Sequence, residues 1–171
     1  EMGQYTVITL SMKGIQASKA KNQEDQEEQE DPNEQLKNQL NDFKSMMSEL
    51  YVQHLYLLEH LDPIQAKRFN DVREEKTNES QLISSFKNLI LLMERYHKRK
   101  VVVLLDEYDT PMLDAFYGGF EEDFNGFYRA FIGNALKGNK SLRLAVVTGI
   151  MQIAGAGLFS SFNNAAVFNL L

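Results

Sequence analysis

Three carboxylates that directly follow an apolar run are the residues in this chain best suited to chemistry. Residues 101–105 are all apolar, and Asp106, Glu107 and Asp109 come straight after them. Such a run is typical of a strand buried on both faces of a parallel sheet, and such sheets bind ligands at the carboxyl ends of their strands. In an extended chain Asp106 and Glu107 would point to opposite sides. One carboxylate could then hold a metal ion through water while the other faces a nucleophile.

The pattern fits two interpretations equally well on these residues alone. The first is a Walker B element, in which Asp106 positions Mg²⁺ and Glu107 orients water for attack on a phosphate. The second is a solvated turn after an ordinary strand. A second buried-strand pattern, residues 142–147, ends in Thr148. Its hydroxyl could sense a γ-phosphate or hold attacking water, but only in the company of Asp106 and Glu107.

Composition narrows the class of protein. The chain has 171 residues, 43% of them hydrophobic, which is enough for one sizeable core and predicts a single domain over residues 1–171. The lack of cysteine excludes Cys-ligated zinc and cysteine nucleophiles, and it fits the cytoplasm. A net charge of −6 argues against a general nucleic-acid-binding surface. No apolar run approaches the length of a membrane span. We therefore expect a soluble, cytoplasmic protein that binds neither membrane nor nucleic acid through this segment.

The first half of the chain predicts a strand followed by helices. Residues 5–12 are rich in strand-forming side chains, and residues 19–31 are too acidic and polar for a core, which predicts a mobile loop. A long helix is expected to begin at Asp31-Pro32 and to run to about Leu61, because apolar residues recur at spacings of three and four. His54 lies on this apolar stripe, where a core or boundary role is favoured over a ligand role.

Further helices are predicted on either side of the acidic strand. A short helix is expected from Pro63 to about residue 70, and another begins near Asn78, with Gln81 as its capping-box partner. That helix ends in the basic cluster at residues 97–100, which we interpret as compensation of the helix dipole before nucleic-acid contact. A last helix ends at Gly138. Phenylalanines at helical spacing along it predict core packing: Phe120, Phe124, Phe127 and Phe131.

These motifs together resemble the bacterial AAA-ATPase-like family. The resemblance rests on Asp-Glu-Tyr-Asp-Thr-Pro at residues 106–111, Thr-Gly at 148–149 and Phe-Asn-Asn at 162–164, and it extends from the first strand through Asn164. It implies an α/β three-layer P-loop NTPase fold with a mainly parallel sheet. It also implies ATP binding and Mg²⁺-dependent hydrolysis, and often a C-terminal PD-(D/E)xK nuclease-like domain in the full-length protein.

The resemblance also implies roles for single residues by their matching positions. Asp106 would be the Mg²⁺-coordinating acid, acting through water, and Glu107 the water-orienting acid. Thr148 would be the sensor at the neighbouring strand end. Three further residues would support the nucleotide site: Asp109, Asn163 and Asn164.

Two departures from the family pattern bear on activity. The family's phosphate-binding loop lies upstream of the segment that matches residues 5–12, and no Gly-x-x-x-x-Gly-Lys-Ser/Thr motif occurs in the chain. In addition, Gln152 and Gly155 stand where basic residues are usual. We therefore expect a partial domain that hydrolyses no ATP by itself. One alternative is an interaction module that kept the fold and lost hydrolysis. Another, ranked lower for want of a strand-borne lysine, is a metal-dependent nuclease using Asp106, Glu107 and Asp109.

The departure also yields an architectural prediction. In the P-loop proteins that the chain resembles, the P-loop strand would lie between the strands at residues 101–105 and 142–147. Open apolar edges are costly and adhesive in water. We therefore expect the two strands either to pair directly or to accept a strand from another chain, which would produce a homo-oligomer. Helices are expected to cover both faces of the sheet.

Overall fold

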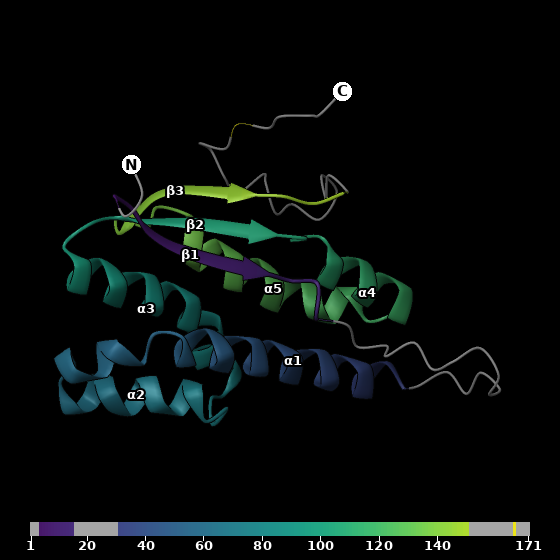
Figure 1. Ribbon diagram of the computed structural model, residues 1–171. Coiled ribbons are helices and arrows are strands. Elements are labelled where there is room, and N and C mark those ends of the chain that lie inside the picture. Colours follow the sequence, from purple (N-terminus) through teal and green to yellow (C-terminus); the bar gives the residue numbers. More distant parts are fainter. Residues whose placement is uncertain (1–3, 16–30, 151–165, 167–171) are drawn as a thin grey trace.

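The computed structural model describes residues 4–15, 31–150 and 166, which form a parallel sheet with helices on one face (Figure 1). The sheet order is β1-β2-β3. The strands are β1 (Thr6–Ser11), β2 (Val101–Asp106) and β3 (Leu142–Val147). The helices are α1 (Pro32–Val52), the 3-10 helix η1 (Leu55–His60), α2 (Pro63–Arg73), α3 (Glu79–His97), α4 (Thr110–Gly118) and α5 (Glu121–Leu136). The predicted α/β class with a parallel sheet is confirmed.

The two strands that carry the predicted site pair directly with each other. Val103 of β2 lies opposite Ala145 of β3, and Leu105 lies opposite Val147. On its other edge β2 pairs with β1 as far as Ser11 and Asp106. The first form of the pairing prediction is therefore confirmed, and within the described part of the chain no strand separates β2 from β3.

The prediction that helices cover both faces of the sheet is wrong for the described residues. Side chains alternate along β2, so that Val103 is fully buried whereas Leu104 is 38% exposed. Leu144 and Val146 of β3 are 54% and 43% exposed on the same face as Leu104. Parallel strands in the order β1-β2-β3 explain this arrangement, because right-handed connections that advance in one direction place all their helices on one face.

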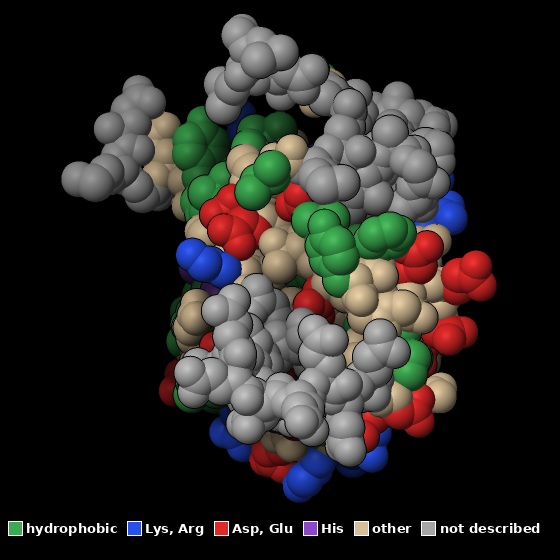
Figure 2. All heavy atoms as spheres, turned by 90° about the vertical axis from the view of Figure 1, so that its right-hand side faces the viewer, with side chains coloured by type: hydrophobic (Ala, Val, Ile, Leu, Met, Phe, Trp, Pro, Cys, Tyr) green, Lys and Arg blue, Asp and Glu red, His purple; other side chains and the backbone are tan. Residues whose placement is uncertain are grey.

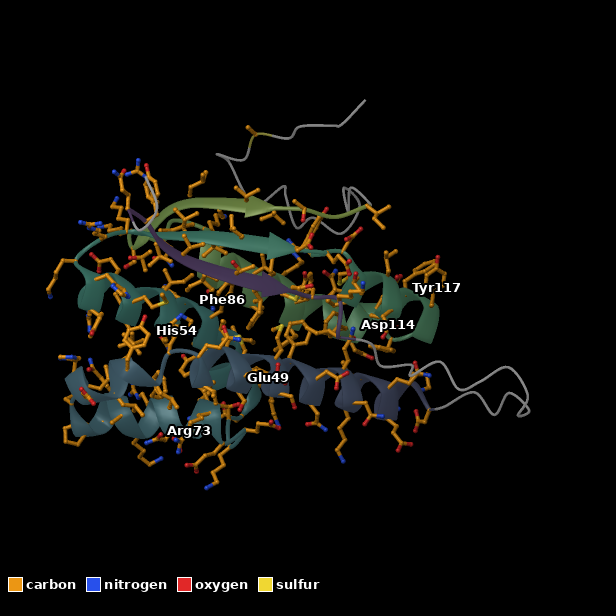
Figure 3. The ribbon with its side chains drawn as sticks, in the orientation of Figure 1. Glu49, His54, Arg73, Phe86, Asp114 and Tyr117 are labelled. Atoms are coloured by element: carbon orange, nitrogen blue, oxygen red, sulfur yellow. The ribbon has the colours of Figure 1, made fainter. Side chains whose placement is uncertain are left out.

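The core lies between the sheet and the helices beneath it. α3 and α5 pack against each other below the strands, and α1 packs against α3 and α4. Phe43 of α1 contacts the predicted phenylalanine stripe of α5, with ring centroids 5.1 Å from Phe127 and 5.3 Å from Phe131. Phe86 of α3 stacks on Phe131 at 5.8 Å and lies between sheet and helices in Figure 3. The stripe is core packing, as predicted.

Helix starts follow the sequence signals more closely than helix ends do. Asn78 and Gln81 form the predicted capping box at the start of α3, and Asp62 begins α2. The long first helix, however, ends at Val52 instead of reaching Leu61. His54 interrupts it, because its ring Nδ1 donates to the Leu50 carbonyl (2.8 Å) and its backbone leaves the helical region. As predicted, His54 is a core histidine, with 9% of its surface exposed.

Three remaining points concern the acidic loop, helix α4 and membrane-spanning segments. Most of the predicted acidic loop at residues 19–31 lies outside the described residues. α4, directly after the acidic motif, was not predicted as a separate helix. None of the helices in the described ranges has the length and apolar character needed to cross a membrane.

Candidate functional site at the ends of β2 and β3

The ends of β2 and β3 bring Asp106 and Thr148 together. Because the two strands are parallel neighbours, their carboxyl ends meet at one edge of the sheet. The Thr148 hydroxyl donates a hydrogen bond to Asp106 Oδ1. Backbone hydrogen bonds extend the pairing past the strand ends, from Thr148 N to Leu105 O (2.8 Å) and from Tyr108 N to Thr148 O (3.0 Å). The predicted Walker B and sensor residues are therefore in direct contact.

Glu107 occupies an unusual backbone conformation. Its φ is 53°, in the left-handed region that non-glycine residues seldom adopt. The strand ends at Asp106, and the Glu107 N–H turns back to donate to Asp106 Oδ1 (3.0 Å). The prediction that these two acids point to opposite sides of an extended chain is therefore wrong. A sharp turn, stabilised by the first carboxylate, sets the position of the second.

Asp109 ties together the loops that follow the two strands. Its carboxylate is buried, with 2% of the residue exposed, and Oδ2 accepts a hydrogen bond from the backbone N–H of Ile150 (2.9 Å). Asp109 also begins α4, and its carbonyl accepts from the N–H groups of Met112 (3.1 Å) and Leu113 (3.0 Å). Asp109 therefore holds the loop after β3 in position and is less suited to direct contact with a nucleotide.

Gly149 fits into the same junction only because it lacks a side chain. A Cβ at this position would lie 2.5 Å from Asp109 Oδ1 and 2.6 Å from the Tyr108 ring. Both neighbours are buried, so a Cβ here would force one of these side chains or the loop itself to shift. Sequence reasoning noted Gly149 only as part of the Thr-Gly motif. The requirement for glycine comes from close approach of two loops, which a sequence does not reveal.

Tyr128 supports the turn from below and was missed by sequence reasoning. It is fully buried in α5, and its hydroxyl donates to the Tyr108 carbonyl. Burial raises the pKa of Tyr128 far above its usual value, with smaller contributions from Tyr108 and Asp109, so the hydroxyl stays protonated. Tyr128 directly follows Phe127 in the phenylalanine stripe. Its buried hydroxyl within an aromatic core was the available signal for a specific partner.

A buried glutamine links α1 to the same turn. Gln39 Nε2 donates to the carbonyl of Pro111 (2.8 Å) in the first turn of α4. Gln39 Oε1 is buried too and has no hydrogen-bond partner among the described residues. A buried amide oxygen without a hydrogen-bond partner costs stability, whereas the amide N–H bond to Pro111 offsets part of the cost of burying this side chain. The long helix is thereby connected to the motif that carries the acids.

The donor atoms suit a hydrated cation better than a fully protein-bound one. Within the described residues, the hydrogen bonds that the Asp106 carboxylate accepts from Glu107 and Thr148 both reach Oδ1, and Asp106 is an exposed residue. In the described ranges no group of three or more acidic or histidine side chains gathers in a way that could hold a metal ion. Mg²⁺ keeps several waters and uses one or two carboxylates together with substrate phosphates. Asp106 fits that mode, and the three-acid cluster of the nuclease hypothesis gains no support.

The surface around the strand ends is mixed in character. Figure 2 views the molecule from this end and shows acidic and apolar side chains reaching the surface together. Tyr117, which is 81% exposed, projects from α4 at the same end (Figure 3). The remaining predicted site residues, Asn163 and Asn164, lie outside the described residues, as do Gln152 and Gly155.

Comparison with known proteins assigns the family. A family model described as a predicted AAA-ATPase matches residues 1–159. No curated protein and no solved structure gives a significant match. The matched region contains β1, β2, β3 and the Asp106 to Thr148 contact, and it confirms at the family level the resemblance carried by the sequence motifs. The chain therefore belongs to the family of predicted AAA-ATPases.

Proposed function

We propose that this chain supplies the Walker B and sensor elements of an ATP-hydrolysing site. The observation that carries the proposal is the hydrogen bond from Thr148 to Asp106, which joins the tips of two parallel strands. Such a contact fixes a carboxylate and a hydroxyl at the edge where parallel sheets bind ligands. A solvated turn after an ordinary strand does not require a hydrogen bond between its first carboxylate and a side chain that follows the neighbouring strand.

Each residue has a distinct role in the proposed reaction. Asp106 would hold the waters of a bound Mg²⁺, which neutralises phosphate charge when it is present. Glu107 would accept a hydrogen bond from the attacking water and orient it toward the γ-phosphate. Thr148 would fix the Asp106 carboxylate and could contact the phosphate oxygens. Asp109, through Ile150 N, would keep Thr148 in register with Asp106.

We further propose that the complete domain has the three-layer arrangement of a P-loop NTPase. All-parallel sheets are almost always covered on both faces. Here one face carries exposed or half-buried apolar side chains in register across the strands: Val7 beside the half-buried Val102 and Leu144, and Leu104 beside Val146. A second helical layer would bury them. The phosphate-binding loop, for which this sequence has no motif, would come from that complete domain, expected to act in the cytoplasm.

A variant of the complete protein tests the hydrolytic role. Glu107→Gln should keep ATP binding and slow hydrolysis by about 10²- to 10³-fold, as expected for loss of one preorganised group. Glu122→Gln is the matched control, because Glu122 is an exposed acid in the first turn of α5. Binding is measured with a fluorescent ATP analogue and turnover by phosphate release. Equal loss of binding and turnover in Glu107→Gln would assign Glu107 a structural role instead.

The 171-residue chain alone provides a second test. Without a phosphate-binding loop, it should show no measurable ATP hydrolysis and at most weak, Mg²⁺-dependent nucleotide binding. Turnover by this chain that Glu107→Gln abolishes would contradict the partial-domain interpretation. Normal ATP binding by the complete protein, with no turnover in either form, would favour the alternative of a non-hydrolysing interaction module.

A further inference from the structure

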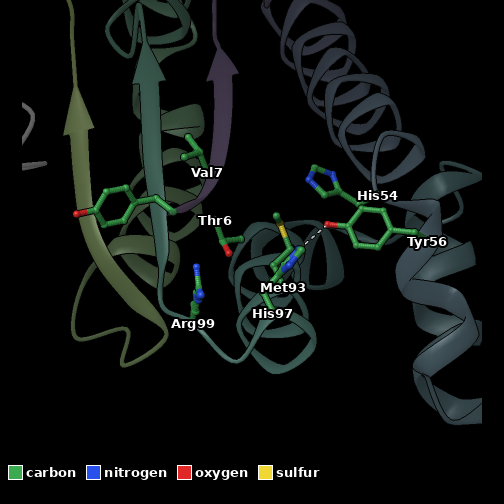
Figure 4. A pocket seen from close by; sticks show the side chains of 8 residues that line it. Thr6, Val7, His54, Tyr56, Met93, His97 and Arg99 are labelled. Atoms are coloured by element: carbon green, nitrogen blue, oxygen red, sulfur yellow. Dashed lines mark hydrogen bonds between the residues drawn. The ribbon is translucent and has the colours of Figure 1, made fainter. Parts of the chain in front are cut away.

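A pocket lies at the opposite end of the sheet from the acidic site. Its volume is about 430 Å³, within the range of small-molecule sites. Figure 4 shows Arg99 and Thr6 on the strand side, His54 and Tyr56 on the helical side, and Met93 and His97 between them. The remaining lining residues are Tyr5 and Val7. The strands begin here and end at Asp106, so the two sites are separated by about 17 Å, the length of β1.

The lining of this pocket contains basic side chains, although the chain as a whole is acidic. It contains one arginine and two histidines, and no aspartate or glutamate among the described residues lines it. Arg99 also donates to the carbonyl of Gln4 (3.2 Å), which holds its guanidinium near β1. The chain carries a net charge of −6. The side chains that line this pocket therefore differ in charge from the rest of the protein surface, because they include a positive arginine and no described acidic residue.

In each of the two histidines, one ring nitrogen has a hydrogen-bond partner within the protein. His54 Nδ1 bonds to the Leu50 carbonyl and must donate, because a carbonyl only accepts. The other ring nitrogen of His54, Nε2, takes no part in that bond. His97 Nε2 lies 3.0 Å from the Tyr56 hydroxyl (Figure 4). A protonated imidazole donates hydrogen bonds from both of its ring nitrogens.

The surroundings of His97 disfavour a positive charge on its ring. The pKa of His97 is lowered by partial burial, and further by the nearby His54 and Arg99. The Tyr96 ring contacts the rings of His97 and His60 beside the pocket. A bound anion would offset the repulsion among these groups. The same anion would raise the pKa of His97 back toward or above its ordinary value.

We propose that this pocket binds the phosphate group of a small phosphorylated molecule, with the Arg99 guanidinium as the charged anchor and the ring nitrogens of His54 and His97 as hydrogen-bonding partners. Arginine and protonated histidine form charge-assisted hydrogen bonds to phosphate oxygens. The hydroxyls of Thr6 and Tyr56 supply further donors. Tyr5 and Met93 give the pocket an apolar wall, which suits an organic group attached to the phosphate. This site is separate from the proposed ATP site and does not depend on hydrolysis.

Titration followed by NMR tests the proposal on the 171-residue chain. Inorganic phosphate and phenyl phosphate are added separately at pH 6.5, and the histidine ring signals are recorded across a pH series with and without each compound. Both compounds should raise the pKa of His97. Tighter binding of phenyl phosphate than of phosphate would identify a phosphorylated organic molecule as the ligand, and equal binding would identify free phosphate.

Two arginine variants locate the binding site. Arg99→Gln should weaken phosphate binding about tenfold, as expected for loss of one charge-assisted contact. Arg129→Gln is the matched control, because Arg129 lies in another cationic hollow, with Lys87 and Lys137, and should leave binding unchanged. Equal weakening by the two variants would indicate nonspecific attraction and overturn the proposal. An unchanged His97 pKa at saturating phosphate would overturn it independently of any variant.

Discussion

Gly149→Ala is the sharpest test of how the candidate site is built. The new methyl group would lie 2.5 Å from Asp109 Oδ1 and 2.6 Å from the Tyr108 ring. Asp109 and Tyr108 are buried, the Asp109 carbonyl accepts hydrogen bonds at the start of α4, and the Tyr108 N–H donates to the Thr148 carbonyl. The loop after β3 must therefore move away. That movement breaks the bond from Ile150 N to Asp109 Oδ2 and separates Thr148 from Asp106.

The expected loss of stability follows from two contributions. Overpacking of a filled site costs about 1–3 kcal/mol, and loss of a hydrogen bond to a charged group costs about 1.5–3 kcal/mol. Because moving the loop relieves part of the overlap, the two do not add fully, and we expect a total of about 2–4 kcal/mol. With a urea m-value of about 2 kcal/mol/M, the midpoint should fall by about 1–2 M.

Urea unfolding followed by far-UV circular dichroism measures this change. Gly133→Ala is the matched control, because Gly133 lies inside α5 and a Cβ there meets nothing within 4 Å. That control should stabilise the chain by about 0.5–1 kcal/mol through helix propensity. If Gly149→Ala unfolds at the same urea concentration as the unmodified chain, the close junction of the two loops is not a feature of the folded protein.

Three further predictions concern other parts of the fold. Tyr128→Phe should lower the free energy of unfolding by about 1–3 kcal/mol, because it leaves the buried Tyr108 carbonyl without its donor; a change below 0.5 kcal/mol in urea unfolding would contradict this. Asn78→Ala removes the capping box that it forms with Gln81 and should cost about 1 kcal/mol, whereas Asn78→Asp should restore most of the loss. The folded-state pKa of His97 is lowered, so the unfolded chain binds more protons and stability should fall as pH decreases through about 6.5; His97→Asn should reduce that dependence, and an unchanged pH profile would count against the histidine's environment.

Local signals in the sequence predicted the elements with strong start patterns. The Asn78 capping box places the beginning of α3 at the right residue, since the two side chains satisfy backbone donors that lie within one turn. The run at residues 142–147 matches β3 in full. Helix ends depend on competition with side chains instead. The break at His54 comes from one ring nitrogen taking part in a bond to Leu50, which the apolar periodicity does not record.

The covering of the sheet could not be predicted from the strands alone. Val101 to Leu105 is apolar throughout, and such a run suits burial on two faces. Which faces are covered depends on the order of the strands and the hand of their connections, and both are properties of the whole fold. In the described part of the chain this order leaves Leu104 on the open face.

The sequence predicted the principal residues of the candidate site, but it did not predict the backbone turn and the packing contacts that hold them in place. The neighbouring strand tips place Asp106 against Thr148, as parallel pairing requires. The left-handed turn at Glu107, the contact at Gly149 and the support from Tyr128 arise from backbone geometry and tertiary packing. The bacterial origin, the nuclease-like domain and the cytoplasmic location stay predictions, since they come from the family resemblance or the composition and from no side-chain contact.

The backbone at Glu107 has a consequence for how this family could change over time. A left-handed conformation in a residue with a side chain costs about 1–2 kcal/mol, and at Glu107 that strain is present in every folded molecule. Asparagine tolerates this region better than glutamate does. Substitution by asparagine would thus relieve strain and remove the proposed water-orienting acid in one step. Where selection no longer maintains hydrolysis, stability alone would favour loss of the glutamate at this position. We therefore expect some family members to fold well and yet lack the water-orienting acid.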